Sequence, residues 1–160
     1  MTKRTISQTC TCTCGTSKLI VTAKPLLRFI CHCTICQAVF QRPYADVMVY
    51  WSGDVALQEN HAIKFKKYRL PPAVNRGLCS ACNAPMVGLL RLAPFVRLAF
   101  VAVSNYPDQA ALPVANAHIF YHSRVADIEN AVPKHNGYWR SQLAIASLLT
   151  SAVLHRGVRR

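Results

Sequence analysis

The amino-acid sequence predicts a mainly β domain followed by one helix near its C-terminal end. Short runs of β-branched and aromatic residues, separated by turn residues, recur along most of the chain. Hydrophobic residues make up 52% of the sequence and charged residues 16%, a composition that excludes a disordered chain. A length of 160 residues suits one domain with a core of its own. Many short strands in such a chain indicate an all-β architecture.

Six segments have the pattern of a short strand: residues 19–21, 46–51, 62–68, 86–92, 97–103 and 117–122. The third alternates the apolar residues Ile63 and Phe65 with lysines, which predicts one buried face and one solvent face. Two prolines, Pro71 and Pro72, end this strand, and Pro94 separates the fourth strand from the fifth.

The segment at residues 141–154 predicts a helix instead. It contains neither Gly nor Pro and is rich in Ala and Leu. At about 21 Å it is too short to cross a bilayer, and no run of 18 apolar residues occurs elsewhere, so we expect no membrane span. We expect this helix to pack on the sheet or on a second copy of the chain in a homo-oligomer. A helix lying on a membrane surface is the alternative.

The eight cysteines carry the strongest functional signal. They form three groups: Cys10, Cys12 and Cys14; Cys31, Cys33 and Cys36; and Cys79 and Cys82. The polar N-terminal segment lacks the apolar stretch of a secretory signal, so we expect a cytoplasmic protein whose thiols stay reduced. Disulfides would need an oxidising compartment, and an iron–sulfur cluster would need a fourth cysteine in the second group. Zinc bound by thiolates fits the spacings better.

The cysteines divide into one set of four and one set of three. The set of four, which suffices for a closed structural zinc site, is Cys12, Cys14, Cys79 and Cys82. The set of three is Cys31, Cys33 and Cys36. Three protein ligands leave the fourth zinc position open, as in catalytic sites. Cys10 is left over as an alternative first-site ligand, a fourth ligand to the second metal, or a free thiol.

In this pattern the sequence resembles the glutathione-dependent formaldehyde-activating (GFA) enzymes, a family that includes centromere protein V. The family pattern is C-x-C-G, then C-H-C-x-x-C, then R-x-F-C-x-x-C-G, and its counterparts here are residues 12–15, 31–36 and 76–83. A later segment, residues 112–119, is similar to the P-x-x-H-I segment of the family. The resemblance extends to about Trp139.

The resemblance implies a mainly β, Mss4-like fold over residues 12–139, preceded by an N-terminal tail at 1–11 and followed by a helix and basic tail at 140–160. It implies two zinc ions, a structural one on the set of four cysteines and one at the active site on Cys31, Cys33 and Cys36. The implied activity is that of a carbon–sulfur lyase, resembling an S-(hydroxymethyl)glutathione synthase, which acts on a thiol such as glutathione and an aldehyde such as formaldehyde.

The chain departs from the family pattern at four positions beside the cysteines: Gln37 stands for the usual Arg or Lys, Gln41 for Gly, Leu78 for Phe and Asn83 for Gly. Asn tolerates a positive φ better than other residues that carry a side chain, so a turn after Cys82 can form. The metal ligands are intact. The residues that flank the second group would line the substrate pocket, however, so these departures leave the identity of the substrate undecided.

Histidines and charge complete the prediction. His32 lies between two metal ligands, and in an extended segment its side chain points away from them, so we expect it to support the site and not to bind the metal. We expect His118 to lie on a strand with its polar ring atoms hydrogen-bonded. The formal net charge of +13 favours anionic partners, either a small peptide such as glutathione or nucleic acid. The alternative function is therefore a zinc-stabilised binding module for an anionic partner, although no compact basic and aromatic stretch supports it.

Overall fold

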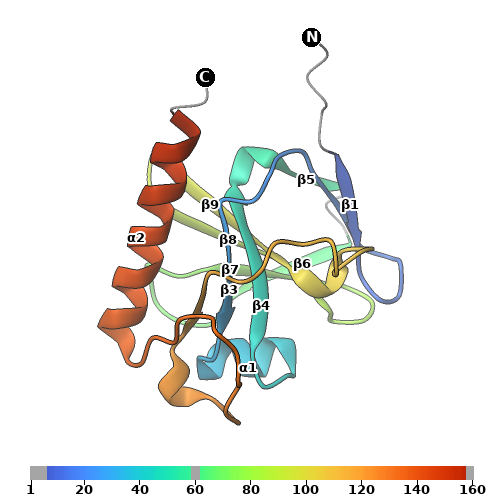
Figure 1. The fold of residues 1–160 in the computed structure, drawn as a ribbon. Helices are drawn as coiled ribbons and strands as arrows, with labels where there is room; N and C mark the ends of the chain where they lie inside the picture. The colour runs from blue at the N-terminus through green and yellow to red at the C-terminus, as the bar shows by residue number, and fades with distance from the viewer. Residues whose placement is uncertain (1–6, 59–61, 158–160) are drawn as a thin grey trace. The chain divides into compact units, whose positions relative to one another are not determined.

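The computed structural model of the protein describes residues 7–58 and 62–157 (Figure 1). The chain forms two compact units, and each of them combines two separate parts of the sequence. Unit 1 comprises Met1–Pro25 and Val49–Leu112, and unit 2 comprises Leu26–Met48 and Pro113–Arg160. Taken as a whole, the described chain contains ten strands and one long helix near its C-terminal end, so the predicted mainly β fold class is confirmed.

Unit 1 contains a small antiparallel sheet of three strands. The strands are β1 (Gln8–Thr11), β2 (Lys18–Val21) and β5 (Val55–Gln58), and they lie in the order β1-β2-β5. A short 3-10 helix, η1 (Ser52–Asp54), precedes β5. β1 falls within residues 1–11, where the sequence predicts a tail. Its Cys10 is fully buried and lies opposite Leu19, which is also fully buried.

Four longer antiparallel strands follow in the same unit. They are β6 (Ile63–Lys67), β7 (Asn75–Cys79), β8 (Pro85–Ala93) and β9 (Val96–Ala102), each hydrogen-bonded to the next, and η2 (Val103–Asn105) follows them. The predicted faces of β6 hold for the buried Ile63 and for the exposed lysines, but not for Phe65, which is 37% exposed. Its ring lies over Gly77, where a Cβ atom would stand 2.8 Å from Phe65 Cε1. Only glycine leaves room for this ring.

Unit 2 holds the remaining elements. They are β3 (Leu27–Cys31), α1 (Thr34–Phe40), the start of β4 (Ala45–Trp51), β10 (Ala117–Ile119), η3 (Tyr121–Ser123) and α2 (Tyr138–Gly157). Strand β3 lies between β10 and β4, and its pairing with β10 is parallel. The Arg28 guanidinium in β3 donates to both carboxylate oxygens of Asp46 in β4, at 2.9 and 2.6 Å. This bidentate ion pair fixes the two strands against each other.

Helix α2 is longer at both ends than the predicted 141–154, and it contacts β3 and β10. Its buried Ser141 hydroxyl accepts a hydrogen bond from the Phe120 N–H at 2.8 Å and donates to the Gly137 carbonyl at 2.7 Å. β10 is shorter than predicted, because η3 begins two residues after it ends. No helix among the described residues is long and apolar enough to pass through a bilayer.

Candidate metal centres

The first cysteine cluster lies in unit 1, where two tight turns meet. The turn after β1 carries Cys12 and Cys14, and the end of β7 with the turn after it carries Cys79 and Cys82. The four Sγ atoms all lie within 4.8 Å of one another. The Sγ of Cys12 is 3.4 Å from that of Cys14 and 3.6 Å from that of Cys79, and the Cys14–Cys79 distance is 3.7 Å. The structure thus brings together thiols that are more than 60 residues apart.

Both turns depend on a residue with positive φ. The Gly15 N–H donates to the Cys12 carbonyl at 3.0 Å with φ at +78°, and the Asn83 N–H donates to the Cys79 carbonyl at 2.9 Å with φ at 58°. The expectation that Asn83 could replace the family glycine in a turn is therefore confirmed. Each turn directs its two sulfurs toward the same point, as the binding of one metal ion by both sulfurs requires.

Hydrogen bonds to the sulfurs adjust the acidity of these thiols. Burial alone would raise the pKa of Cys79, but the Ser17 hydroxyl and the backbone N–H groups of Cys82 and Ala81 lower it to about 6. Burial raises the pKa of Cys12 to about 11, although the Ser17 N–H donates to its sulfur at 3.2 Å. A cation bound to these sulfurs would stabilise both as thiolates, and would therefore lower the pKa of Cys12.

The geometry of this cluster fits a tetrahedral metal ion. Four Zn–S bonds of about 2.3 Å place the sulfurs about 3.8 Å apart. The measured separations of 3.4–3.7 Å are close to this value and far longer than the ~2.05 Å of a disulfide bond. All four are free cysteines. The cluster could therefore bind a metal ion, with Cys82 as the fourth ligand within 4.8 Å of the other three sulfurs.

The second cluster lies in unit 2, where β3 leads into α1. Cys31 is the last residue of β3, Cys33 caps the N-terminus of α1, and Cys36 lies in its first turn. The Cys36 N–H donates to the Cys33 sulfur at 3.4 Å, and the three sulfurs lie within 4.8 Å of one another. Cys31 and Cys36 are buried, while Cys33 is half-buried. Among the described residues, no further His, Cys, Asp or Glu side chain joins this group.

The three sulfurs of the second cluster oppose one another's ionisation. The neighbouring Cys33 and Cys36 sulfurs, together with burial, raise the pKa of Cys31 well above its ordinary value. A bound cation would reverse this effect, because it stabilises thiolates more than the neighbours destabilise them. The donor set is soft and suits zinc better than magnesium or calcium.

Gln37, one of the departures from the family pattern, ties this cluster to the loop after β10. Its side-chain amide donates to the His32 carbonyl and to the Ser123 carbonyl, both at 2.7 Å. The amide thereby uses both of its N–H donors on backbone oxygens. Another departure, Gln41, ends α1 in the left-handed conformation at φ 49°. Both residues therefore shape the backbone around the second cluster.

The two histidines singled out by the sequence lie against each other. Nε2 of His32 is 3.0 Å from Nδ1 of His118, and Nε2 of His118 is 3.1 Å from the Asn130 amide nitrogen. Both rings are buried. His118 lies on β10 and each of its ring nitrogens has a hydrogen-bond partner, as the sequence predicts. Burial, followed by the charges of His118 and Arg124, lowers the pKa of His32 to about 4. Beyond the presence of a histidine in each motif, nothing in the sequence indicates this pairing.

Cys10 belongs to neither cluster among the described residues. It is fully buried, and its thiol interacts with the Tyr106 hydroxyl, which in turn lies 2.6 Å from the Tyr50 hydroxyl. Burial raises the pKa of Cys10 to about 12 despite the Tyr106 contact. Of the three roles left open by the sequence, the structure supports that of a free thiol in the core.

Comparisons with known proteins agree with the cysteine geometry. A family model described as glutathione-dependent formaldehyde-activating enzyme matches residues 7–123, well over half of the chain. A crystal structure of a Rhodobacter sphaeroides protein is similar, with a TM-score of 0.50 and 16% sequence identity over 62% of this chain and 87% of that one. At that identity the likeness bears on the fold alone. No curated protein matches the sequence.

Proposed function

This chain belongs to the glutathione-dependent formaldehyde-activating enzyme family, and from that membership we propose that it is a zinc-dependent carbon–sulfur lyase that joins a thiol such as glutathione to a small aldehyde such as formaldehyde. The observation that carries the proposal is the second cluster, in which three thiols converge without a fourth described ligand. The cluster of four would hold a second, structural zinc ion.

Three residues have roles in this proposal. Cys31 and Cys36 are buried and would anchor the metal, while the half-buried Cys33 would mark the side from which substrate enters. Zinc held there would supply a coordination position that lowers the pKa of an incoming thiol. Three thiolates give the site a net charge of about −1 with Zn²⁺, which suits binding of a soft thiol better than activation of water.

The chemical step forms one bond and needs no external oxidant or reductant. The substrate sulfur, as a thiolate, attacks the aldehyde carbon and forms the C–S bond. The electron pair of the C=O π bond moves to oxygen, which takes up one proton and becomes the hydroxyl of a hydroxymethyl thioether. The reverse reaction is the lyase step. Two cations, Arg124 and Lys134, lie close enough to His32 and His118 to lower the pKa values of these histidines, and they are candidates to hold the carboxylates of the thiol. Arg124 would then exchange its present carboxylate partner, Asp127, for that of the substrate.

The test is the exchange rate between free and thiol-bound formaldehyde at equilibrium. Carbon-13 exchange NMR with glutathione separates the catalysed rate from the spontaneous one, because the position of equilibrium does not change. We expect protein-dependent exchange that Cys33→Ser abolishes and Cys10→Ser retains. Cys10 is the control because the same substitution there changes a cysteine that lies outside both clusters.

A second measurement tests the thiol site without turnover. Cobalt bound by thiolates absorbs in the visible, and a fourth sulfur ligand changes that absorption. We expect the spectrum of the cobalt-substituted protein to change when glutathione is added, and Cys33→Ser to remove the change. A spectrum that no small thiol alters would overturn the proposed thiol site, even if the protein retained both metal ions.

A further inference from the structure

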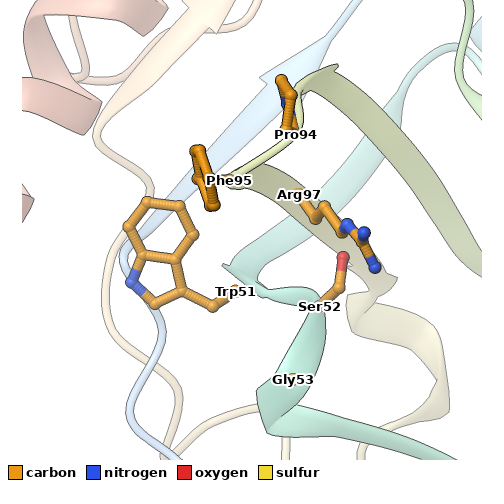
Figure 2. Close-up of a pocket in the computed structure, with 6 residues that line it drawn as sticks. All are labelled: Trp51, Ser52, Gly53, Pro94, Phe95 and Arg97. Carbon is orange, nitrogen blue, oxygen red and sulfur yellow. The ribbon is translucent and has the colours of Figure 1, made fainter.

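Unit 1 carries a surface hollow. None of the residues that line it is a cysteine, and none belongs to the metal cluster of this unit. The hollow forms where the end of β4 and η1 face the turn between β8 and β9, and its volume is about 500 Å³. Its lining residues are Trp51, Ser52, Gly53, Pro94, Phe95 and Arg97 (Figure 2). This volume falls within the range of small-molecule pockets.

One side of the hollow is aromatic. β8 ends at Ala93 and β9 begins at Val96, so Phe95 stands in a two-residue turn, where it is 94% exposed. Trp51 ends β4 and is half-buried. Figure 2 shows the Phe95 ring and the Trp51 indole on the same side of the hollow. Two aromatic groups, one of them almost entirely in solvent, form a surface on which a planar ring can stack.

The other side of the hollow is cationic and polar. The Arg97 side chain extends along it toward the Ser52 hydroxyl (Figure 2). Arg97 is directly opposite Arg91 in the register of β8 and β9, so both side chains project from the same face of the sheet. Like charges in directly opposite positions destabilise a sheet. Within the described part of the chain, neither arginine forms an ion pair with a carboxylate. An anion bound between them would remove this repulsion.

We propose that this hollow binds a nucleotide unit, with the base stacked on Phe95 and Trp51 and the phosphate held by Arg97 of the lining and by Arg91, which lies opposite Arg97 in the sheet and outside the lining. An aromatic platform beside a cation is the arrangement by which proteins hold single-stranded nucleic acid without reading its sequence. The formal net charge of +13 adds long-range attraction for the same ligand. Glutathione does not fit the aromatic side, since it contains no ring. Free nucleotides and single-stranded nucleic acid share this chemistry, and the experiment separates them.

The tryptophan in the hollow provides the readout. The chain has two tryptophans, so a Trp139→Phe background leaves Trp51 as the only indole fluorophore. Three ligands are titrated: an oligomer of eight deoxyadenosines, an abasic oligomer of the same length, and adenosine monophosphate. We expect the deoxyadenosine oligomer to quench Trp51 and to bind at least tenfold more tightly than the abasic one. Binding of the mononucleotide within tenfold of the oligomer assigns the site to free nucleotides, and weaker binding assigns it to single strands.

Variants test the two sides of the hollow separately. Phe95→Ala and Phe95→Leu should weaken binding of the deoxyadenosine oligomer about 5- to 150-fold, the effect of losing one stacked base. Arg97→Gln should weaken it and reduce the slope of log affinity against log salt by about one. Leu92→Ala is the matched control, because Leu92 is an exposed apolar residue of the same hairpin outside the hollow.

Three results would overturn the proposal. They are the absence of Trp51 quenching at millimolar ligand, equal affinity for the abasic oligomer, and unchanged affinity in both Phe95 variants with native circular dichroism. No residue of either cysteine cluster takes part, so nucleotide binding and thiol–aldehyde turnover can each fail without the other.

Discussion

Nε2 of His32 lies 3.0 Å from Nδ1 of His118, and the hydrogen bonds around this pair determine which nitrogen of each ring carries the proton. The Asn130 carbonyl oxygen accepts from the Val132 N–H and from the Lys134 ammonium, each at 3.2 Å. This orientation directs the Asn130 NH₂ group toward His118 Nε2, which must accept. His118 Nδ1 is then the donor to His32 Nε2, so the proton of a neutral His32 lies on its other nitrogen, Nδ1, a buried atom without a hydrogen-bond partner among the described residues.

The first prediction is therefore that both buried histidines are neutral and carry the proton on Nδ1. Free histidine prefers the other tautomer, so the arrangement is diagnostic. Two-bond nitrogen–hydrogen correlation NMR distinguishes the tautomers by the shifts of the two ring nitrogens. In Asn130→Asp, where a carboxylate replaces the NH₂ donor, His118 should instead carry a proton on Nε2. A spectrum in which wild-type His32 is protonated on Nε2 contradicts the assignment.

The second prediction concerns acid pH. Burial, followed by the charge of Lys134, lowers the pKa of His118 below its ordinary value of about 6.5. The unfolded chain then binds the proton more readily than the folded one, so the free energy of unfolding falls as the pH drops below about 6.5. Thermal melting between pH 8 and pH 5 should show this loss, and His118→Gln should show a shallower one. Bound metal is measured in the same samples, because acid also releases metal from thiolates.

The third prediction is that the first cluster holds the fold together. Cys79 is fully buried, and its sulfur is within 3.7 Å of the sulfurs of Cys12 and Cys14. A structural zinc site contributes about 10–16 kcal/mol of binding free energy, comparable with the whole stability of a domain. Cys79→Ser should therefore give insoluble or unfolded protein. A soluble variant with the wild-type melting profile would show that the cluster is not structural.

The fourth prediction separates Cys10 from the metal ligands. Cys10→Ser should retain the wild-type metal content, measured by atomic emission on purified protein. It should also lose about 1 kcal/mol of stability, because a hydroxyl replaces a thiol in the core of unit 1 beside Tyr106. The loss of one full equivalent of metal would make Cys10 a ligand.

The sequence predicts those parts of the fold whose signal is local. Strands β2, β4, β8 and β9 were predictable because apolar, β-branched runs end at turn residues, and α2 because its run lacks Gly and Pro. The sequence did not predict four strands and one helix: β1, β3, β5, β7 and α1. α1 has only seven residues, and it begins at a cysteine cap whose role is visible only in three dimensions. β3 is fixed by its parallel pairing with β10, which no local pattern encodes.

The cysteine spacing likewise gives both candidate metal centres, since C-x-C and C-x-x-C turns bring sulfurs together wherever they occur. What surrounds the centres does not follow from spacing. His32 and His118 are 86 positions apart, and their contact arises from the pairing of β3 with β10. Trp51 ends β4, while Phe95 stands in the turn between β8 and β9, which explains why the sequence shows no compact basic and aromatic stretch although the structure forms such a surface.

The fifth prediction concerns Gln37, which connects the second cluster to η3. Its amide donates to the carbonyls of His32 and Ser123, both at 2.7 Å, so it fixes the backbone between two of the cluster's cysteines. Gln37→Ala removes both donors and should weaken metal binding at this cluster about 10- to 100-fold, the usual effect of losing a group that orients a ligand. Gln37→Lys keeps a donor and should lose less. Gln37→Glu should lose most, because its carboxylate faces two carbonyl oxygens.

Competition with a chromophoric chelator measures the affinity of both metal equivalents. Only the affinity of the more weakly bound equivalent, which we assign to the second cluster, should change. If Gln37→Ala and Gln37→Glu bound metal at this cluster with the same affinity as each other, these hydrogen bonds would not be what positions the cluster.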